Sequence, residues 1–278
     1  MKPLKPLEIA RSYITRGWSP VPVPHQHKGP VIKGWQNLRI TEGTAPQYFI
    51  GKKQNIGVLL GEPSTGLVDL DMDWPEAAQL RHHFLPATLT FGRVSNPTSH
   101  ALVISPGAVT RKFQLSEVEG GTVLEIRSDG TQTVFPGSTH TSGEAISFDN
   151  KNPLAVIDAK VLHQLGAEWA AASVLRRHWA DGVKDDLAAA VCGTLLRAGW
   201  SAEKVNRFVE IISTEAADHD TPAKLKAERL AEKLESGAAT FRGCRVSGKS
   251  SESVQRTRSA SGWVCVWTAR QSVRLWLN

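Results

Sequence analysis

The sequence is poor in cysteine, and Cys192, Cys244 and Cys265 are widely spaced. No two of them form a C-x-x-C pair, which argues against a thiolate zinc site or a redox disulfide. Long apolar runs are also missing. No stretch approaches the roughly 18 apolar residues of a membrane span, and the first residues contain no continuous apolar segment of the signal-peptide type. These absences predict a soluble, cytoplasmic protein with no membrane partner.

Most of the chain also lacks an excess of charge of either sign. The formal net charge is +6, but seven basic residues and a single acidic residue lie from Arg242 onward, which accounts for all of it. Residues 1–241 are therefore neutral overall. The pI of about 9.3 describes the end of the chain and does not by itself indicate that the body binds nucleic acid.

Hydrophobic periodicity predicts a first domain over residues 1–152 that mixes strands with a few helices. Helices are expected at residues 5–16 and 75–83. Such a mixture indicates an α/β or α+β fold. The expected strands are 19–23, 56–60, 67–72, 101–104, 122–127, 131–135 and 145–148.

After residue 152 the strand signal ends, and residues 153–241 predict a small helical bundle. Ser201 and Thr221 are expected to start helices, and Gly199 and Gly237 to end them. The remaining residues, 242–278, are rich in Ser and Arg and show no sustained periodicity, so a poorly ordered basic tail is expected. The expected helices are 155–165, 167–180, 183–198, 202–216 and 222–236.

The segment from Leu67 to Trp74 carries alternating acids. In an extended chain Asp69, Asp71 and Asp73 share one face, while apolar residues occupy the other. Crowded carboxylates repel each other, and oxygen ligands of this kind select Mg²⁺ or Mn²⁺. The alternative is a solvated edge strand whose acids discourage aggregation.

A fourth acid, Glu125, follows in an alternating segment at 121–127. Together with the aspartates it can complete a two-metal site, in which one cation activates an attacking oxygen and the other stabilises the leaving oxygen. The alternative is that Glu125 and Arg127 form an ordinary charge pair on a strand surface. The candidate metal ligands are therefore Asp69, as a possible auxiliary, with Asp71, Asp73 and Glu125.

A turn rich in Gly, Pro and Asn lies between these segments, at residues 91–100. It carries Arg93 and ends in Ser99 and His100, so it can present cationic donors to a triphosphate. The alternative for His100 is an ordinary half-buried histidine.

These pieces, in this order, resemble the bifunctional primase–polymerase domain of plasmid- and phage-type replication proteins, within the archaeo-eukaryotic primase superfamily. The family's D-x-D motif matches Asp71-Met-Asp73, its Ser-His motif matches Ser99-His100, and its later acid matches Glu125. The resemblance covers residues 5 to about 150. It implies an RRM-like mixed sheet with the acids on its open face, followed by a helical domain.

The resemblance also implies a function: DNA priming and polymerisation with two Mg²⁺ or Mn²⁺ ions, on a single-stranded DNA template with nucleoside triphosphates. A replicative helicase would then be a separate partner. Asp71, Asp73, Glu125 and His100 are the expected catalytic residues. The expected nucleotide-binding residues are Arg93, Ser99, His100, Arg127, Lys33 and His140.

Two other functions stay open. One is a non-catalytic replication-initiation protein that binds DNA, and the other is a metal-dependent nuclease. Residues 243–250 match the P-loop pattern G-x-x-x-x-G-K-[ST], but they lack the preceding strand and following helix that an ATPase needs. The pairs His25/His27 and His82/His83 can each ligate a metal, yet neither has a third ligand at a recognisable spacing.

Overall fold

The computed structural model describes residues 5–51, 53–116, 119–218, 227, 230–232, 236, 263–267 and 272–276. It contains two compact units. Unit 1 comprises residues 1–78 and 84–166, and unit 2 comprises residues 79–83 and 167–278. The three domains predicted from the sequence, 1–152, 153–241 and 242–278, remain a prediction. The P-loop-like segment and most of the predicted helix 222–236 lie outside the described residues.

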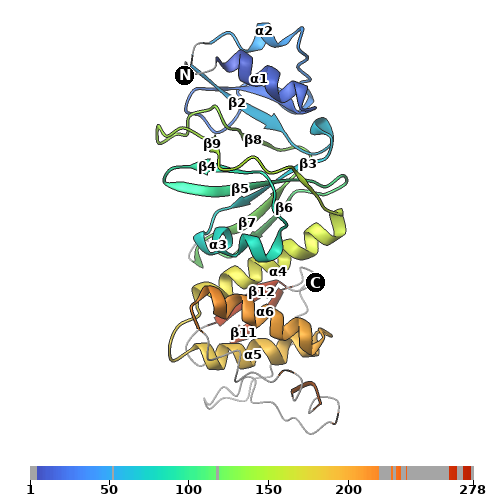
Figure 1. Cartoon of the computed structure of the whole chain (residues 1–278), viewed down its shortest axis with the longest axis vertical. Helices are drawn as coiled ribbons and strands as arrows, with labels where there is room; N and C mark the ends of the chain where they lie inside the picture. The colour runs from blue at the N-terminus through green and yellow to red at the C-terminus, as the bar shows by residue number, and fades with distance from the viewer. Residues whose placement is uncertain are drawn as a thin grey trace. The chain divides into compact units, whose positions relative to one another are not determined.

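Unit 1 contains a small antiparallel sheet in the order β1-β2-β8, formed by Ser19–Pro24, Gln54–Leu59 and Gln132–Val134. Strand β1 holds three prolines and pairs with β2 alone, as expected because proline cannot donate to a second neighbour. Helix α1 (Pro6–Thr15) packs on β1 and β2 (Figure 1). Its Tyr13 hydroxyl donates to the Pro136 carbonyl at 2.6 Å. Trp18 and Phe135 stack edge to face in the same core.

A larger sheet in the order β6-β7-β3-β5-β4-β9 carries the acidic segment, and β10 pairs with β5. Neighbours are antiparallel except β10 and β5, which are parallel, so the sheet is mixed and the predicted α+β class is confirmed. The strands are β3 (Leu67–Met72), β4 (Thr90–Arg93), β5 (Asn96–Ile104), β6 (Arg111–Gln114), β7 (Thr122–Arg127), β9 (Ser147–Phe148) and β10 (Ala155–Val156).

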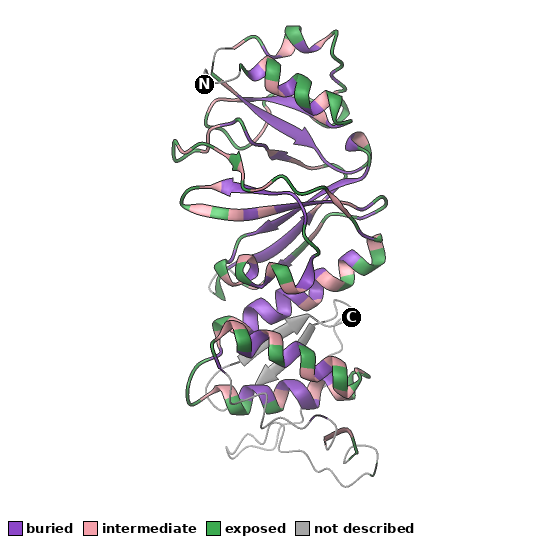
Figure 2. Cartoon of the chain, viewed as in Figure 1, coloured by how far each residue is buried: buried purple, intermediate pink, exposed green. Residues whose placement is uncertain are grey.

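Strand β3 lies inside this sheet, between β7 and β5. All six of its residues are buried, and purple predominates in the inner strands of the larger sheet in Figure 2. The alternative of a solvated edge strand is therefore wrong. A row of acids in the middle of a sheet requires compensating charge nearby, because burial penalises each ionised carboxylate.

The remaining elements of unit 1 differ in detail from the prediction. The turn at residues 91–100 is a β-hairpin, and neither β4 nor β6 was predicted, because both are four-residue strands too short for a periodic signal. The helix predicted at 75–83 is present. The elements are η1 (Trp35–Asn37), α2 (Ala45–Tyr48), η2 (Glu62–Ser64) and α3 (Pro75–Phe84), of which residues 79–83 belong to unit 2.

Helix α4 (Ala159–Arg177) joins two predicted helices into one. The prediction placed a break at Gly166, but this glycine lies within the helix and approaches the larger sheet closely. A Cβ atom there would lie 2.9 Å from Ile126 Cδ1 and 2.9 Å from Phe113 Cε2. Gly166 thus permits close packing of helix on sheet and does not end the helix.

We expect Gly166→Ala to destabilise the protein by about 1–3 kcal/mol, because the methyl group overpacks a buried contact. An unconstrained Gly→Ala change in a helix interior has the opposite sign and stabilises by about 1 kcal/mol. Urea unfolding followed by circular dichroism measures the difference. If Gly166→Ala were more stable than the wild type, α4 would have moved away from the sheet without loss of stability, and the overpacking argument would be wrong.

Unit 2 contains α5 (Lys184–Arg197) and α6 (Ala202–Glu215), which pack against each other. The predicted signals hold at these ends: Gly199 follows α5 with a φ of 89°, and Ser201 Oγ accepts from the Lys204 backbone N–H at 3.2 Å. Within the predicted tail, β11 (Trp263–Trp267) and β12 (Ser272–Trp276) pair antiparallel, and the poor order expected for residues 242–278 remains a prediction. Among described residues, no helix has the length and apolarity to cross a membrane.

Candidate active site

One row of side chains crosses the larger sheet from strand to strand. Lys112 faces Glu125, Glu125 faces Asp71, Asp71 faces His100, and His100 faces Phe91, so the row spans β6, β7, β3, β5 and β4. Directly opposed residues in neighbouring strands project from the same side of a sheet. The register therefore brings Asp71, Glu125 and His100 together, as the sequence predicted for the catalytic residues.

Arg127 supplies the main compensating charge for the acids. Its Nη2 atom lies 2.6 Å from Asp71 Oδ2, and its Nε donates to Glu125 Oε2 at 2.9 Å. Burial would lower the pKa of the guanidinium, but Asp71, Asp69 and Glu125 outweigh it and raise that pKa. The repulsion between carboxylates is therefore partly relieved by the chain's own cations before any metal binds.

His100 is held by carboxylates on one edge and by an aromatic ring on its face. Its Nδ1 atom lies 3.1 Å from Asp69 Oδ2 and 3.6 Å from Asp71 Oδ1, and its ring stacks on Phe91 at 4.5 Å with 5° between the planes. Burial would lower the pKa of the imidazole, but the two aspartates outweigh it and raise the pKa. His100 is thus oriented and favoured as a cation, with Nε2 on the ring edge opposite Asp69.

Asp69 is the most enclosed of the four acids, with no exposed surface. Besides His100, it accepts a hydrogen bond from Thr133 Oγ1 of β8 at 2.6 Å. Burial would raise its pKa, but His100, Arg127 and Thr133 together hold that pKa below the ordinary value. Because its carboxylate already contacts His100 and Thr133, Asp69 is suited to orient His100.

Asp73 follows β3 and is exposed, unlike Asp69 and Asp71. Partial desolvation and the neighbouring Asp71 charge raise the pKa of Asp73 to about 6. For Asp71, burial likewise outweighs the attraction of His100 and Arg127 and raises its pKa. Excess negative charge therefore remains at this end of β3.

We expect Asp73→Asn to change how stability without metal depends on pH. The raised folded-state pKa means that the native wild-type protein binds more protons than the unfolded chain between about pH 4 and pH 6, so its stability falls as pH rises through this window. The variant lacks this contribution and is more stable at pH 7, by at most about 1 kcal/mol because the side chain is exposed. Urea unfolding in EDTA at pH 4, 5, 6 and 7 measures the free energy of unfolding of both proteins. A difference between wild type and variant that does not change with pH would contradict the raised pKa of Asp73.

The donor set fits divalent cations. Asp69, Asp71, Asp73 and Glu125 bring four negative charges when ionised, and Arg127, Lys112 and protonated His100 return three positive ones, which leaves a net −1 among these groups. Carboxylate oxygens are the hard ligands that Mg²⁺ and Mn²⁺ prefer. Asp71, Asp73 and Glu125 are the residues that can hold such ions.

A second polar cluster forms around the β4–β5 hairpin. Arg93 Nε lies 3.3 Å from Glu144 Oε2, and Glu144 also accepts from Ser95 and Ser142. Burial, then Arg93 and Lys28, lower the pKa of His140. The structure therefore brings together Arg93 and His140, both predicted to contact nucleotide, and adds Lys28.

Two predicted residues lie apart from these clusters. Ser99 is buried and precedes His100 in β5, so alternation along the strand directs its side chain to the opposite face. Lys33 is exposed in the loop before η1. Sequence reasoning did not assign Lys112 or Thr133, because only the strand register reveals that they contact Glu125 and Asp69.

The segment that builds both clusters matches a known family. Residues 10–160, more than half of the chain, match the family model described as bifunctional DNA primase/polymerase, N-terminal. The chain belongs to the bifunctional DNA primase/polymerase family. This membership supports a role in DNA replication, with DNA and nucleotides as the substrates. No curated protein matches the chain.

Proposed function

We propose that this primase/polymerase family member is an active, template-directed nucleotidyltransferase that starts and extends strands on single-stranded DNA in plasmid- or phage-type replication. The observation that supports it best is the row formed by Glu125, Asp71 and His100, with Asp73 exposed beside it, inside the segment that matches the family. A replication-initiation protein that only bound DNA would have no need for net negative charge at its centre, which repels phosphates.

Asp71, Asp73 and Glu125 would hold two Mg²⁺ or Mn²⁺ ions, which supply activation of a hydroxyl nucleophile and stabilisation of the leaving oxygen. In the reaction, a 3′-hydroxyl oxygen forms a bond to the α-phosphorus of the incoming nucleotide. The bond from that phosphorus to the bridging oxygen breaks, and pyrophosphate leaves. Arg127 pairs with both Asp71 and Glu125 and fixes their positions through these two contacts.

Cationic groups of the chain bind the triphosphate in this proposal. His100 donates from Nε2, because Nδ1 faces Asp69 and Asp71. Arg93 and Lys28 form the second cationic group, beside His140, which donates as a neutral imidazole because burial and then these two charges lower its pKa. Charge-assisted hydrogen bonds to phosphate oxygens are among the stronger polar contacts in proteins.

We expect His100→Ala to weaken nucleotide binding about tenfold or more and to leave DNA affinity within about twofold, since a hydrogen bond to a charged group contributes roughly 1.5–3 kcal/mol. Nucleotide titrations at saturating template, compared with fluorescence anisotropy on labelled DNA, separate the two affinities. His163→Ala is a suitable control, because His163 accepts a backbone N–H from Val109 outside both clusters. An unchanged apparent nucleotide affinity would return His100 to a structural role.

Primer-free incorporation tests the function itself. The full chain is incubated with single-stranded DNA, labelled nucleotides and Mg²⁺ or Mn²⁺, and products are separated by size. Template-dependent products that grow with time support the proposal. Shortened template without new product would indicate a nuclease, and binding without either product would indicate a non-catalytic initiation protein. Ribo- and deoxynucleotides run in parallel report which substrate is used.

A further inference from the structure

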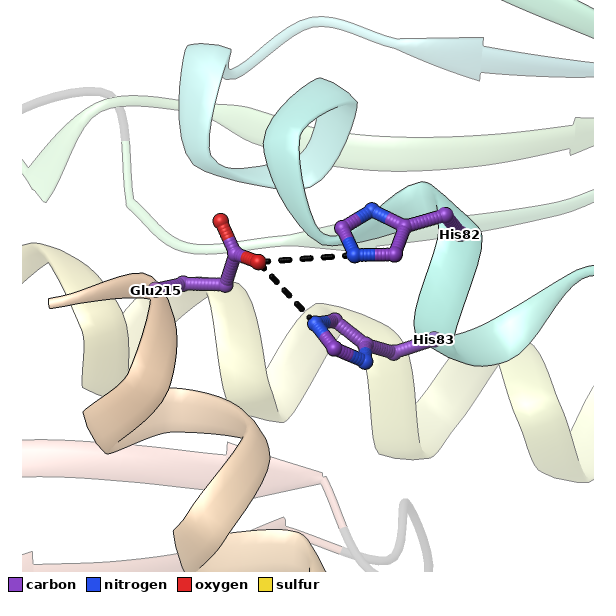
Figure 3. A group of neighbouring side chains, drawn as sticks. All are labelled: His82, His83 and Glu215. Atoms are coloured by element: carbon purple, nitrogen blue, oxygen red, sulfur yellow. Dashed lines mark hydrogen bonds and ion pairs between the residues drawn. The ribbon is translucent and has the colours of Figure 1, made fainter. Parts of the chain in front are cut away.

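A group of three potential metal ligands forms within unit 2, from residues that the sequence left without a common partner. His82 and His83 lie in the last turn of α3, and Glu215 is the last residue of α6. His82 Nε2 lies 3.4 Å and His83 Nε2 lies 3.0 Å from Glu215 Oε1 (Figure 3). Among the described residues, this is the group whose ligand atoms all lie within 4.8 Å of one another.

The spacing of these atoms suits a small four-coordinate ion. With metal–ligand bonds of about 2.0–2.1 Å, neighbouring ligand atoms of a tetrahedron lie about 3.3 Å apart. The two contacts to Glu215, at 3.0 and 3.4 Å, are close to that value. All the ligand atoms lie within 4.8 Å of one another, so bringing each pair to about 3.3 Å requires approaches of at most about 1.5 Å.

The tautomer of His82 also suits metal binding. Its Nδ1 atom lies 3.1 Å from the Gln79 carbonyl oxygen, which can only accept a hydrogen bond, so Nδ1 carries the hydrogen. Neutral His82 then directs the Nε2 lone pair at the carboxylate, and two acceptors face each other at 3.4 Å. A hydrogen bond from the second ring nitrogen to a carbonyl is also the usual support of a histidine that binds metal.

Without a metal, His83 can donate a hydrogen bond from Nε2 to Glu215 Oε1 at 3.0 Å, which leaves His82 Nε2 facing the same oxygen unless both imidazoles are protonated and pair with the carboxylate. The two rings lie 3.9 Å apart between centroids, so two imidazolium charges would be in direct contact. One carboxylate would then balance two positive charges. A divalent cation removes both difficulties, because neutral imidazoles can ligate it while the carboxylate contributes the negative charge.

We propose that His82, His83 and Glu215 form a Zn²⁺ site with three protein ligands and an open fourth position. Two imidazole nitrogens favour Zn²⁺ over Mg²⁺, which prefers oxygen, so this site and the carboxylates of unit 1 select different metals. The side chain of His82 is 58% exposed, which leaves a path for the ion. Glu215 is anchored further by its backbone carbonyl, which accepts from Arg176 Nε at 2.9 Å.

The site would connect two segments of unit 2 that are far apart in the sequence. His83 and Glu215 are separated by 132 positions, and the metal would join the end of α3 to the end of α6. An ion that binds only the folded chain stabilises it in proportion to the logarithm of its concentration. The inference does not depend on nucleotidyl transfer, because its ligands and its metal differ from those of the catalytic proposal.

The test measures metal binding on the full chain, in an Asp71→Asn/Asp73→Asn background that weakens the competing carboxylate site. The metal-free protein is titrated with Co²⁺, whose visible absorption reports four-coordinate nitrogen ligation, and Zn²⁺ is then added in competition. We expect one ion per chain, displacement of Co²⁺ by Zn²⁺, and a Tm increase of about 5–10 °C at a hundredfold excess over Kd.

Glu215→Gln and His83→Asn should each weaken Zn²⁺ binding at least about tenfold and remove the Tm increase. His25→Asn/His27→Asn is the matched control, since it removes the other histidine pair in the sequence, and it should bind like the parent. Thermal melting in EDTA checks that each variant folds. If His83→Asn does not fold, Glu215→Gln still tests the site, because glutamine has nearly the same size as glutamate. Three results would each overturn the proposal. They are Zn²⁺ affinity in Glu215→Gln equal to that of the parent, a parent Tm that does not change with Zn²⁺, and loss of Zn²⁺ binding only in the His25→Asn/His27→Asn variant.

Discussion

Asp71→Asn should reduce primer-free nucleotide incorporation by at least about 1000-fold, the scale seen when a preorganised electrostatic group is removed from an active site. Asp71 occupies the middle of the row, with Glu125 on one side and His100 on the other. Asparagine keeps the size of the side chain but removes the charge that a divalent cation needs. Steady-state incorporation over a series of Mg²⁺ and Mn²⁺ concentrations measures the loss.

Asp181→Asn is the matched control for this variant, because its side chain is almost fully exposed and its ion pair with Lys184, at 3.1 Å, lies at the surface. It should retain wild-type rates. Circular dichroism and Tm values establish that Asp71→Asn remains folded. Incorporation within tenfold of the wild-type rate would remove Asp71 from the set of metal ligands.

Asp69 should behave differently from Asp71 and Asp73, even though all three share one face of β3. Asp69→Ala leaves His100 without its closest carboxylate in a buried setting, and loss of one member of a buried pair typically costs about 3–5 kcal/mol. Asp69→Asn keeps the shape and an acceptor oxygen but removes the charge. The pKa of His100 should then fall, because Asp69 is the first of the charges that raise it.

The Asn variant distinguishes an orienting role for Asp69 from metal ligation. With the orienting role, nucleotide affinity falls about tenfold and falls further as pH rises, since less His100 is protonated, while Mg²⁺ affinity stays within about twofold. Asp73→Asn, its matched counterpart, should show the reverse pattern. NMR titration of His100 measures the pKa directly. A loss of Mg²⁺ affinity in Asp69→Asn as large as that in Asp73→Asn would make Asp69 a ligand.

Alternation along the chain was sufficient to predict that the three aspartates share a face, and the ordered motifs were sufficient to join them to His100 and Glu125. Neither could predict which acid is enclosed. Asp69 is paired with β5 and β7 on its two sides and accepts a hydrogen bond from Thr133 of the smaller sheet, whereas Asp73 follows the end of β3 and is exposed. The sequence also suggested that repulsion among the acids required an external cation, whereas Arg127 supplies much of the compensation.

Other features were hidden because they arise from contacts between distant segments. Gly166 predicted the end of a helix by local rules, but its role is set by Phe113 and Ile126 on the sheet below it. His82 and His83 lacked a third ligand at any regular spacing, because Glu215 comes from another helix. The paired strands β11 and β12 lie in a segment whose composition shows no strand periodicity.

Strand β3 lies between β5 and β7, so the ribosome makes β3 before either of its neighbours. Asp71 is made before both of its cross-strand neighbours, since His100 and Glu125 lie 29 and 54 residues later. At about 5–20 residues per second, the chain needs roughly 3–11 s after Asp71 to produce Glu125. For the first 29 residues of that interval neither His100 nor Arg127 has been made, so we expect the acids to stay hydrated. No truncated fragment that ends before Arg127 contains a complete site, because it lacks the cation that pairs with Asp71 and Glu125.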